Sequence, residues 1–121
     1  MTFDTGALIA LERNKQRTVE IFQNLFRRSE DITVPAAVIT EWWRGRTDVR
    51  DDILDSVVVE LLTPAIAKAA GEALARVKGA SAIDAIVMAS AALRGDLVLT
   101  SAVHDLERLR SHFPSVRVLG V

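Results

Sequence analysis

The chain has 121 residues, which suits one domain, and its 50% hydrophobic and 26% charged residues indicate a folded chain with a core. A net charge of -1 does not indicate a nucleic-acid binder, and the absence of cysteine excludes disulfides, thiolate zinc sites and cysteine nucleophiles. Because no basic segment precedes the first apolar run, and no apolar run is long enough to span a bilayer, we expect a cytoplasmic protein without a membrane segment.

The first half of the chain is predicted to form strands that are each followed by helices. The strands are residues 1–4, which end at Asp4, and 31–35, which end at Pro35. The helices are 5–11, 14–28, 36–46, which stops near Gly45, and a further helix that Asp48 caps and that runs to Leu54.

The second half continues this alternation. Its strands are 56–62, 97–100 and 115–121, and its helices are 64 to 77 or 78, 82–94 and 102–111. The predicted helix starts are Thr63 with Pro64 and Ser81, and the predicted helix ends are Gly79 and Gly95. Strands that alternate with helices predict an α/β fold with a mostly parallel sheet. The apolar runs 57–62 and 97–100 predict strands that are covered on both faces.

Four acidic residues stand out in this arrangement. Asp4 follows the first strand, Asp105 lies a few residues beyond the strand 97–100, and Glu41 and Asp84 lie within apolar helical stretches. In open parallel sheets, ligands bind at the carboxyl ends of the strands. Acids in apolar surroundings are costly unless a cation compensates them, and magnesium and manganese prefer carboxylate oxygens. The pattern therefore predicts a divalent-cation site.

Each acid also has an ordinary structural interpretation, which the sequence alone leaves open. The alternatives are a helix cap for Asp4, an ion pair with Arg44 for Glu41, a capping box with Ser81 for Asp84, and a helix-start charge paired with Arg108 for Asp105. The metal-site hypothesis therefore depends on all four acids together and on their order in the chain.

The sequence resembles the PIN domain, and within it the VapC toxins of toxin–antitoxin pairs. The matching segments are "FDTGALIAL" near the N-terminus, "VPAAVITEWWRG" in the first half, "IDAIVMASAALRGDLVLTS" in the second half and the closing "SVRVLGV". Together these segments span almost the whole chain. Their ordered set of Asp, Pro with Glu, Asp-Ala and Leu-Thr-Ser is more specific than any one of them.

The resemblance implies one domain over residues 1–121, with a three-layer α/β/α fold around a central, mostly parallel sheet of about five strands. It implies a metal-dependent endoribonuclease, a hydrolase that uses Mg²⁺ or Mn²⁺ and whose metal site includes Asp4, Glu41 and Asp84. Relatives usually carry a further acid directly after Thr-Ser, where this chain has Ala102, and often a second one at the position of Asp105. The implied partners are an RNA substrate, a VapB-type antitoxin and a second copy of the chain, without a membrane.

Several other residues are candidates for substrate binding. Thr100 and Ser101 could donate hydrogen bonds that steer a carboxylate or a phosphate, and Thr5 and Gly6 open a helix whose N–H groups could face a phosphate. Arg44 and Arg46, close to Glu41, are the predicted RNA contacts. For the adjacent tryptophans at 42 and 43, one side chain is expected in the core and the other at an interface with a partner.

Two further hypotheses remain beside the nuclease. Ala102 in place of an acid is compatible with a catalytically impaired module that binds RNA or a protein partner without cleavage. A phosphoryl-transfer receiver would need a lysine at a strand end, and the C-terminal half has only Lys68 and Lys78, neither of which follows a strand. The receiver hypothesis is therefore the weaker of the two.

Overall fold

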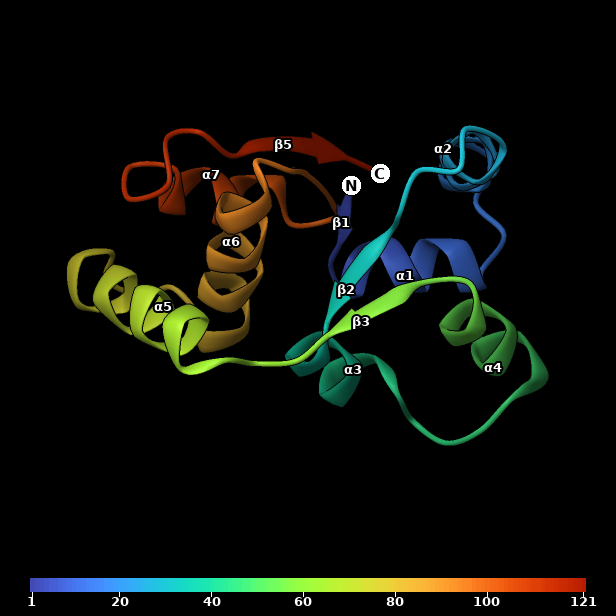
Figure 1. Ribbon diagram of the computed structural model, residues 1–121, viewed down its shortest axis with the longest axis horizontal. Helices are drawn as coiled ribbons and strands as arrows, with labels where there is room; N and C mark the ends of the chain where they lie inside the picture. The colour runs from blue at the N-terminus through green and yellow to red at the C-terminus, as the bar shows by residue number, and fades with distance from the viewer.

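Seven helices flank one sheet of five strands in the computed structural model, which describes residues 1–121 (Figure 1). The strands are β1 (Thr2–Phe3), β2 (Thr33–Pro35), β3 (Val58–Glu60), β4 (Leu97–Thr100) and β5 (Arg117–Gly120). The helices are α1 (Thr5–Glu12), α2 (Gln16–Arg27), α3 (Ala36–Trp42), α4 (Asp48–Asp55), α5 (Pro64–Arg76), α6 (Ala82–Arg94) and α7 (Val103–Leu109). The predicted α/β/α class is confirmed. None of the helices is both long and apolar enough to cross a membrane.

The strand order determines where a ligand site can form. The order is β3-β2-β1-β4-β5, and every neighbouring pair of strands is parallel. From β1 the chain builds outward on one side through β2 and β3, and on the other side through β4 and β5. The order therefore reverses between β1 and β4, where Thr2 lies opposite Val98. Ligands of open parallel sheets bind at such a point, outside the carboxyl ends of the strands.

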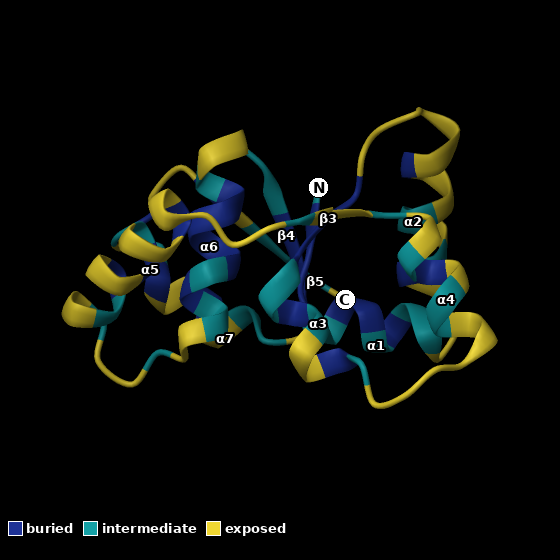
Figure 2. Cartoon of the chain, turned by 60° about the horizontal axis from the view of Figure 1, so that its bottom comes forward, coloured by how far each residue is buried: buried dark blue, intermediate teal, exposed yellow.

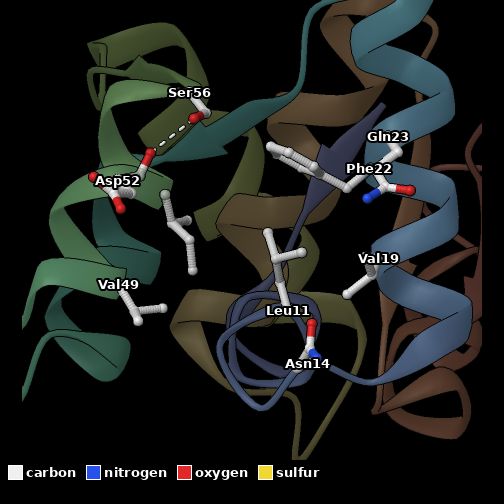
Figure 3. Close-up of a pocket in the computed structure, with 9 residues that line it drawn as sticks. Leu11, Asn14, Val19, Phe22, Gln23, Val49, Asp52 and Ser56 are labelled. Carbon is white, nitrogen blue, oxygen red and sulfur yellow. Dashed lines mark hydrogen bonds between the residues drawn. The ribbon is translucent and has the colours of Figure 1, made fainter.

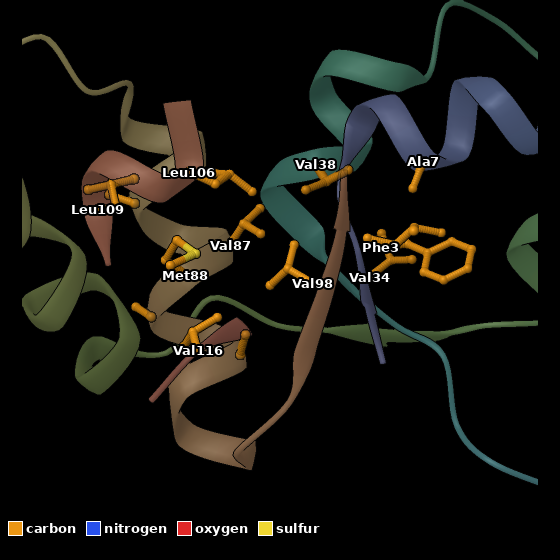
Figure 4. Packing of buried hydrophobic residues seen from close by; sticks show 14 of the residues in the cluster. Phe3, Ala7, Val34, Val38, Val87, Met88, Val98, Leu106, Leu109 and Val116 are labelled. Carbon is orange, nitrogen blue, oxygen red and sulfur yellow. The ribbon is translucent and has the colours of Figure 1, made fainter. Parts of the chain in front are cut away.

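The hydrophobic core lies on both faces of this sheet. Phe3 and Val34 of the central strands pack beneath α1 and α3, while Met88 of α6 lies on the other side of Val98 (Figure 4). All four of these side chains are completely buried. Burial of one such large side chain stabilises the fold by about 1.5–3 kcal/mol. Fully buried Leu106 shows that α7 belongs to the same core.

Local signals at the helix ends agree with the prediction in all but three places. Helix α5 ends at Arg76 rather than at Gly79, because Val77 already has extended backbone angles. The hydroxyl oxygens of Thr63 and Ser81 accept the predicted capping bonds, and Gly95 ends α6 with a left-handed φ of 64°. The cap of α4 is Thr47 rather than Asp48, because the Thr47 hydroxyl accepts the backbone N–H that the first turn leaves free. Helix α3 ends at Trp42, not near Gly45, since the next residue already has extended backbone angles.

The prediction that residues 57–62 are covered on both faces is wrong. Only Val58–Glu60 form a strand, and this strand lies at the edge of the sheet with β2 as its single neighbour. The side chains of Val58 and Leu61 are 48% and 74% exposed, and Figure 2 shows the segment that leads from β3 to α5 as mostly exposed. An apolar run in sequence does not distinguish an edge strand from a central one.

Candidate functional site

Asp4 lies in the turn between β1 and α1, at the carboxyl edge of the sheet. One carboxylate oxygen, Oδ1, accepts the backbone N–H of Ala7 at 3.0 Å, so Asp4 is the N-cap of α1. The other, Oδ2, accepts the hydroxyl of Thr100. Asp4 is therefore a helix cap, as one interpretation of the sequence held. Because each carboxylate oxygen has a second lone pair, the group can still bind a cation.

Thr100, the last residue of β4, orients this carboxylate. Its side chain is completely buried, and its hydroxyl also accepts the backbone N–H of Ala102 at 2.8 Å. Because the Thr100 hydroxyl already donates one hydrogen bond and accepts another, and because it is not exposed, it orients the carboxylate of Asp4 rather than a phosphate. The chain thus links the turns after β1 and β4 through one side chain.

Gly6 and Ser101 make these two turns touch. A Cβ at position 6 would lie 1.8 Å from Oγ and 2.6 Å from Cβ of Ser101, well inside ordinary van der Waals contact. Glycine is therefore required at position 6 by the close approach of α1 to the residue after β4. The approach brings the first turn of α1 over the carboxyl end of β4.

Glu41 reaches the same place from α3. Its Oε1 accepts the hydroxyl of Thr5 at 2.7 Å, and its side chain is exposed. The ion pair with Arg44 that the sequence left open does not form. Thr5 therefore fixes Glu41 relative to the start of α1.

A clamp at the other end of α1, which the sequence analysis missed, also holds α3 in place. The indole N–H of buried Trp42 donates to Oε1 of Glu12 at 2.9 Å. Arg50 donates from Nε and Nη2 to the same carboxylate, at 3.1 Å each. These hydrogen bonds hold the pKa of Glu12 below its ordinary value. Trp42 is buried and Trp43 is only half-buried, so the expectation that one of the two tryptophans enters the core is confirmed.

Asp84 and Asp105 come from the first turns of α6 and α7. The Ser81 hydroxyl accepts the backbone N–H of Asp84 at 3.1 Å, so the cap forms, and the Asp84 side chain is half-buried. Asp105 is exposed and has no ion pair with Arg108, whose guanidinium donates instead to the carbonyl of Lys78. Glu41 and Asp105 thus both lack the arginine partners, Arg44 and Arg108, that their ordinary structural roles required.

All four acids line one pocket of about 300 Å³. Four polar or small residues from the turns described above line it with them: Thr5, Gly6, Ser81 and Ser101. Ala102, Ile9, Ile83 and Val87 complete the wall, and no lysine, arginine or histidine takes part. The pocket therefore gathers negative charge without any basic side chain in its lining.

The pKa values of Asp4 and Asp84 are shifted by burial and by the neighbouring negative charges of the pocket. Burial raises the pKa of Asp4, and the charge of Asp84 raises it further, although hydrogen bonds from Thr100 and Ala7 lower it in part. Burial likewise raises the pKa of Asp84, and the charges of Asp105 and Glu41 add to the effect, while the Ser81 hydroxyl opposes it. A bound cation would reverse both shifts.

The opposite edge of the sheet provides an internal comparison. Asp96, just before β4, accepts the hydroxyl of Thr2 at 2.9 Å and pairs with the N-terminal ammonium at 3.0 Å and with Arg94 at 3.4 Å. Although burial acts to raise it, these partners hold the pKa of Asp96 below its ordinary value. The protein itself thus supplies cations to Asp96, whereas the four acids of the pocket have no such partner.

The donors of the acidic pocket suit a hard divalent cation. Carboxylate and hydroxyl oxygens are the only polar side-chain groups in its lining, and magnesium prefers such oxygens while keeping several of its waters. No three acidic side chains are arranged to ligate one metal ion directly in this structure. The set therefore fits an ion that is held partly through water, with one or two carboxylates in direct contact.

The two predicted RNA-contacting arginines lie outside this pocket. Arg46 pairs with Asp48 at 3.1 Å and with Asp51 at 2.7 Å, and so supports the start of α4. Arg44 is exposed and makes no ion pair. Of the two, only Arg44 has a free charge to offer to a ligand.

A different kind of hollow lies between α1, α2 and α4 (Figure 3). It has a volume of about 280 Å³ and is lined mainly by apolar side chains, among them Leu11, Val19, Phe22 and Ile53. Its single acid is Asp52. This hollow lacks the grouped carboxylates of the acidic pocket and cannot supply the same chemistry.

The fold is thus a parallel α/β/α domain with four acids grouped at the point where its strand order reverses. Residues 1–110 match the family model of the PIN domain, and the chain belongs to that family. None of the curated proteins compared with the chain matches it.

Three solved structures share the fold over nearly the whole chain. VapBC2 from Rickettsia felis, bound to a DNA fragment from its promoter, has a TM-score of 0.80 and 10% identity, with 99% of this chain and 97% of that one covered. A toxin–antitoxin complex from Klebsiella pneumoniae has a TM-score of 0.69 and 19% identity, with 95% and 93% covered. FitAB bound to the IR36 DNA fragment has a TM-score of 0.70 and 15% identity, with 99% and 94% covered.

Proposed function

We propose that this chain is a magnesium-dependent endoribonuclease of the VapC type, the toxin of a toxin–antitoxin pair, with manganese as a substitute metal. The observation that carries the proposal is the pocket in which Asp4, Glu41, Asp84 and Asp105 gather without a basic residue. It lies where strand order reverses in a PIN domain. The proteins with the same fold include VapBC2 and a toxin–antitoxin complex, which supports the biological setting.

The four acids divide the work according to their surroundings. Asp4 and Asp84 are the assigned direct ligands, because they are the most buried of the set and burial raises the pKa of both. Exposed Asp105 would complete the shell through water. Glu41, held by Thr5, is assigned to accept a proton from the attacking water. When bound, a divalent cation would lower the pKa of that water and offset charge on the phosphate.

Substrate contacts come from the rim of the pocket. Thr5 and Gly6 of the first turn of α1 and Ser101 line the pocket beside the acids and are assigned to contact the substrate there. Arg44 is the free cation nearest in sequence to Glu41 and is assigned to the RNA backbone. Arg46, which is already paired with two acids, is assigned to hold α4 instead of RNA.

The proposed partners follow from the same setting. We expect a VapB-type antitoxin, because two of the structurally similar proteins are described as a toxin–antitoxin complex or as VapBC2. We also expect a homodimer in the cytoplasm. Size-exclusion chromatography with light scattering of the purified chain, alone and with the product of the neighbouring gene, tests both oligomerisation and partner binding.

Cleavage of a structured RNA by the purified protein tests the activity. Cleavage should require magnesium and should be lost in Asp84→Asn, which keeps the backbone cap with Ser81. Asp55→Asn, a change of the same type at an exposed residue of α4 outside the pocket, is the matched control and should cleave like the wild type. Cleavage that persists in Asp84→Asn would refute the assigned site.

A second candidate function is supported by one observation. The N-cap of α7 is Ala102, which lines the pocket and offers no side-chain oxygen. A catalytically impaired PIN module that binds RNA or a protein without cleavage is compatible with this residue. Ala102→Asp discriminates, because a large gain in magnesium-dependent cleavage supports impairment, whereas little change supports a site that Asp105 already completes.

A further inference from the structure

A second hollow adjoins the acidic pocket across the contact between Gly6 and Ser101. It has a volume of about 270 Å³, and the two hollows share Gly6, Ile9 and Ser101 in their linings. The residues found only in the second hollow include two cations, Arg13 and Lys15. A ligand that fills the acidic pocket can therefore continue over Gly6 into a neighbouring space of opposite charge.

The two cations of the second hollow have no acidic side chain as a partner. Its remaining residues, Ala10 and Val121, have apolar side chains. Arg13 and Lys15 are exposed, and neither forms an ion pair. Arg13 does act electrostatically on Glu12, but that carboxylate is already bound by Arg50. Both cations thus remain available to an anionic ligand.

The backbone fixes where these cations stand. Gly6, Ala10 and Arg13 are spaced as one face of α1, and roughly 10 Å of helix axis separates the first from the last. Asn14 then takes a left-handed φ of 58°, and the N–H of Lys15 bonds to the carbonyl of Ala10 at 2.9 Å. This is a hydrogen-bonded helix end that reverses the chain and returns Lys15 to the same hollow.

We propose that this hollow is a phosphate subsite for the RNA strand, in which Arg13 and Lys15 hold a backbone phosphate beyond the one in the acidic pocket. The proposal rests on the ribonuclease function proposed above and adds the direction in which the RNA leaves the site. A pocket with four acids repels a polyanion on its own account, so binding of the strand needs cations beside it. Cationic grooves that track the backbone are the usual solution for single strands, without regard to base sequence.

The double variant Arg13→Gln, Lys15→Gln tests the subsite. Its matched control is Lys68→Gln, Arg76→Gln, which removes the same charge from exposed, unpaired residues of α5 at the far end of the molecule (Figure 1). Lys15 makes no side-chain capping bond and both hollow cations are exposed, so the fold should be unaffected. Melting temperatures of both double variants should match the wild type.

Affinity for fluorescent single-stranded oligoribonucleotides is then measured over a range of salt, with Asp84→Asn as the common background so that the probe stays intact. The slope of log affinity against log salt should become shallower by about 0.7 for each phosphate that the protein no longer neutralises on a single strand, equally for probes of different sequence. The control should keep the full slope. Equal slopes in the Arg13→Gln, Lys15→Gln variant and in its background would overturn the proposal, as would a background that binds no RNA.

A single neutral methylphosphonate linkage, moved along the probe, gives an independent readout. At the position that faces Arg13 and Lys15, the neutral linkage should weaken binding to the Asp84→Asn protein. At the same position it should have no effect on binding to the protein that also carries Arg13→Gln and Lys15→Gln. Cleavage by the wild type decides the ribonuclease separately. A shallower slope without cleavage supports the subsite and refutes the nuclease, whereas cleavage with an unchanged slope does the reverse.

Discussion

Replacing Gly6 with alanine tests the closest approach at the edge of the acidic pocket. The new Cβ would lie 1.8 Å from Oγ, 2.6 Å from Cβ and 2.9 Å from the backbone nitrogen of Ser101. A hydroxyl can rotate away, but the Cβ and the backbone nitrogen can move only with the chain. Overpacking of this kind costs about 1–3 kcal/mol, and the two immovable neighbours place the cost near the upper end.

The expected drop in melting temperature follows from the size of the domain. For a chain of this length each kcal/mol shifts the midpoint by about 4 °C, so Gly6→Ala should lower it by roughly 8–12 °C. Gly71→Ala is the matched control, since no atom lies within 4 Å of the added Cβ in the middle of α5. Alanine is favoured over glycine there by about 0.5–1 kcal/mol, so this variant should melt slightly higher than the wild type.

Thermal unfolding followed by circular dichroism measures all of these variants. Adding Ser101→Gly to Gly6→Ala removes the Oγ and Cβ of Ser101 from the neighbourhood of the new methyl group and should restore most of the stability. The reasoning is refuted if Gly6→Ala melts within about 2 °C of Gly71→Ala, which is less than the shift that 1 kcal/mol would cause, or if Ser101→Gly destabilises the variant further. Either result would mean that α1 and the end of β4 do not touch in solution.

Three further predictions concern the acids. Asp84→Asn should raise the melting temperature at pH 7 in EDTA, because burial raises the pKa of Asp84 and its charge opposes folding above that pKa. The gain should vanish well below pH 3.8, where the acid is protonated in the folded and the unfolded state. An equal gain at both pH values would contradict the reasoning. Glu12→Ala should lower the free energy of unfolding in urea by about 1–3 kcal/mol, because buried Trp42 loses its hydrogen-bond acceptor. The loss should be smaller in a Trp42→Phe background, and an equal loss there would contradict this explanation. Ala102→Asp should lower the melting temperature in EDTA and enlarge the stabilisation by magnesium, and an unchanged response to the metal would show that position 102 does not face the ion.

Much of the fold can be read from local chemistry. The caps at Thr63 and Ser81 and the left-handed glycine at position 95 are signals within a few residues, and each of them appears in the structure as predicted. The class follows from alternation alone. Asp4 and Asp84 could be singled out for the same reason, because an acid beside an apolar run is conspicuous in any sequence.

What the sequence does not reveal depends on residues far apart in the chain. The exposure of Val58 depends on whether another strand follows β3 in the sheet, which no local pattern encodes. The bond between Glu12 and Trp42 joins the end of one helix to another helix 30 residues later. The burial of Thr100 against a carboxylate is likewise visible only once β1 and β4 are neighbours.

The bond between Thr100 and Asp4 spans 96 residues and constrains when the site can form during synthesis. The central strand β1 leaves the ribosome well before its neighbour β4, because eight other elements lie between them in the chain. Parallel pairing over such a separation is slow and waits for both partners. A nascent chain that has not yet released β4 can hold Asp4, Glu41 and Asp84 without the hydroxyl that orients the first of them. Synthesis of β4 and assembly of the acidic pocket are therefore nearly the same event.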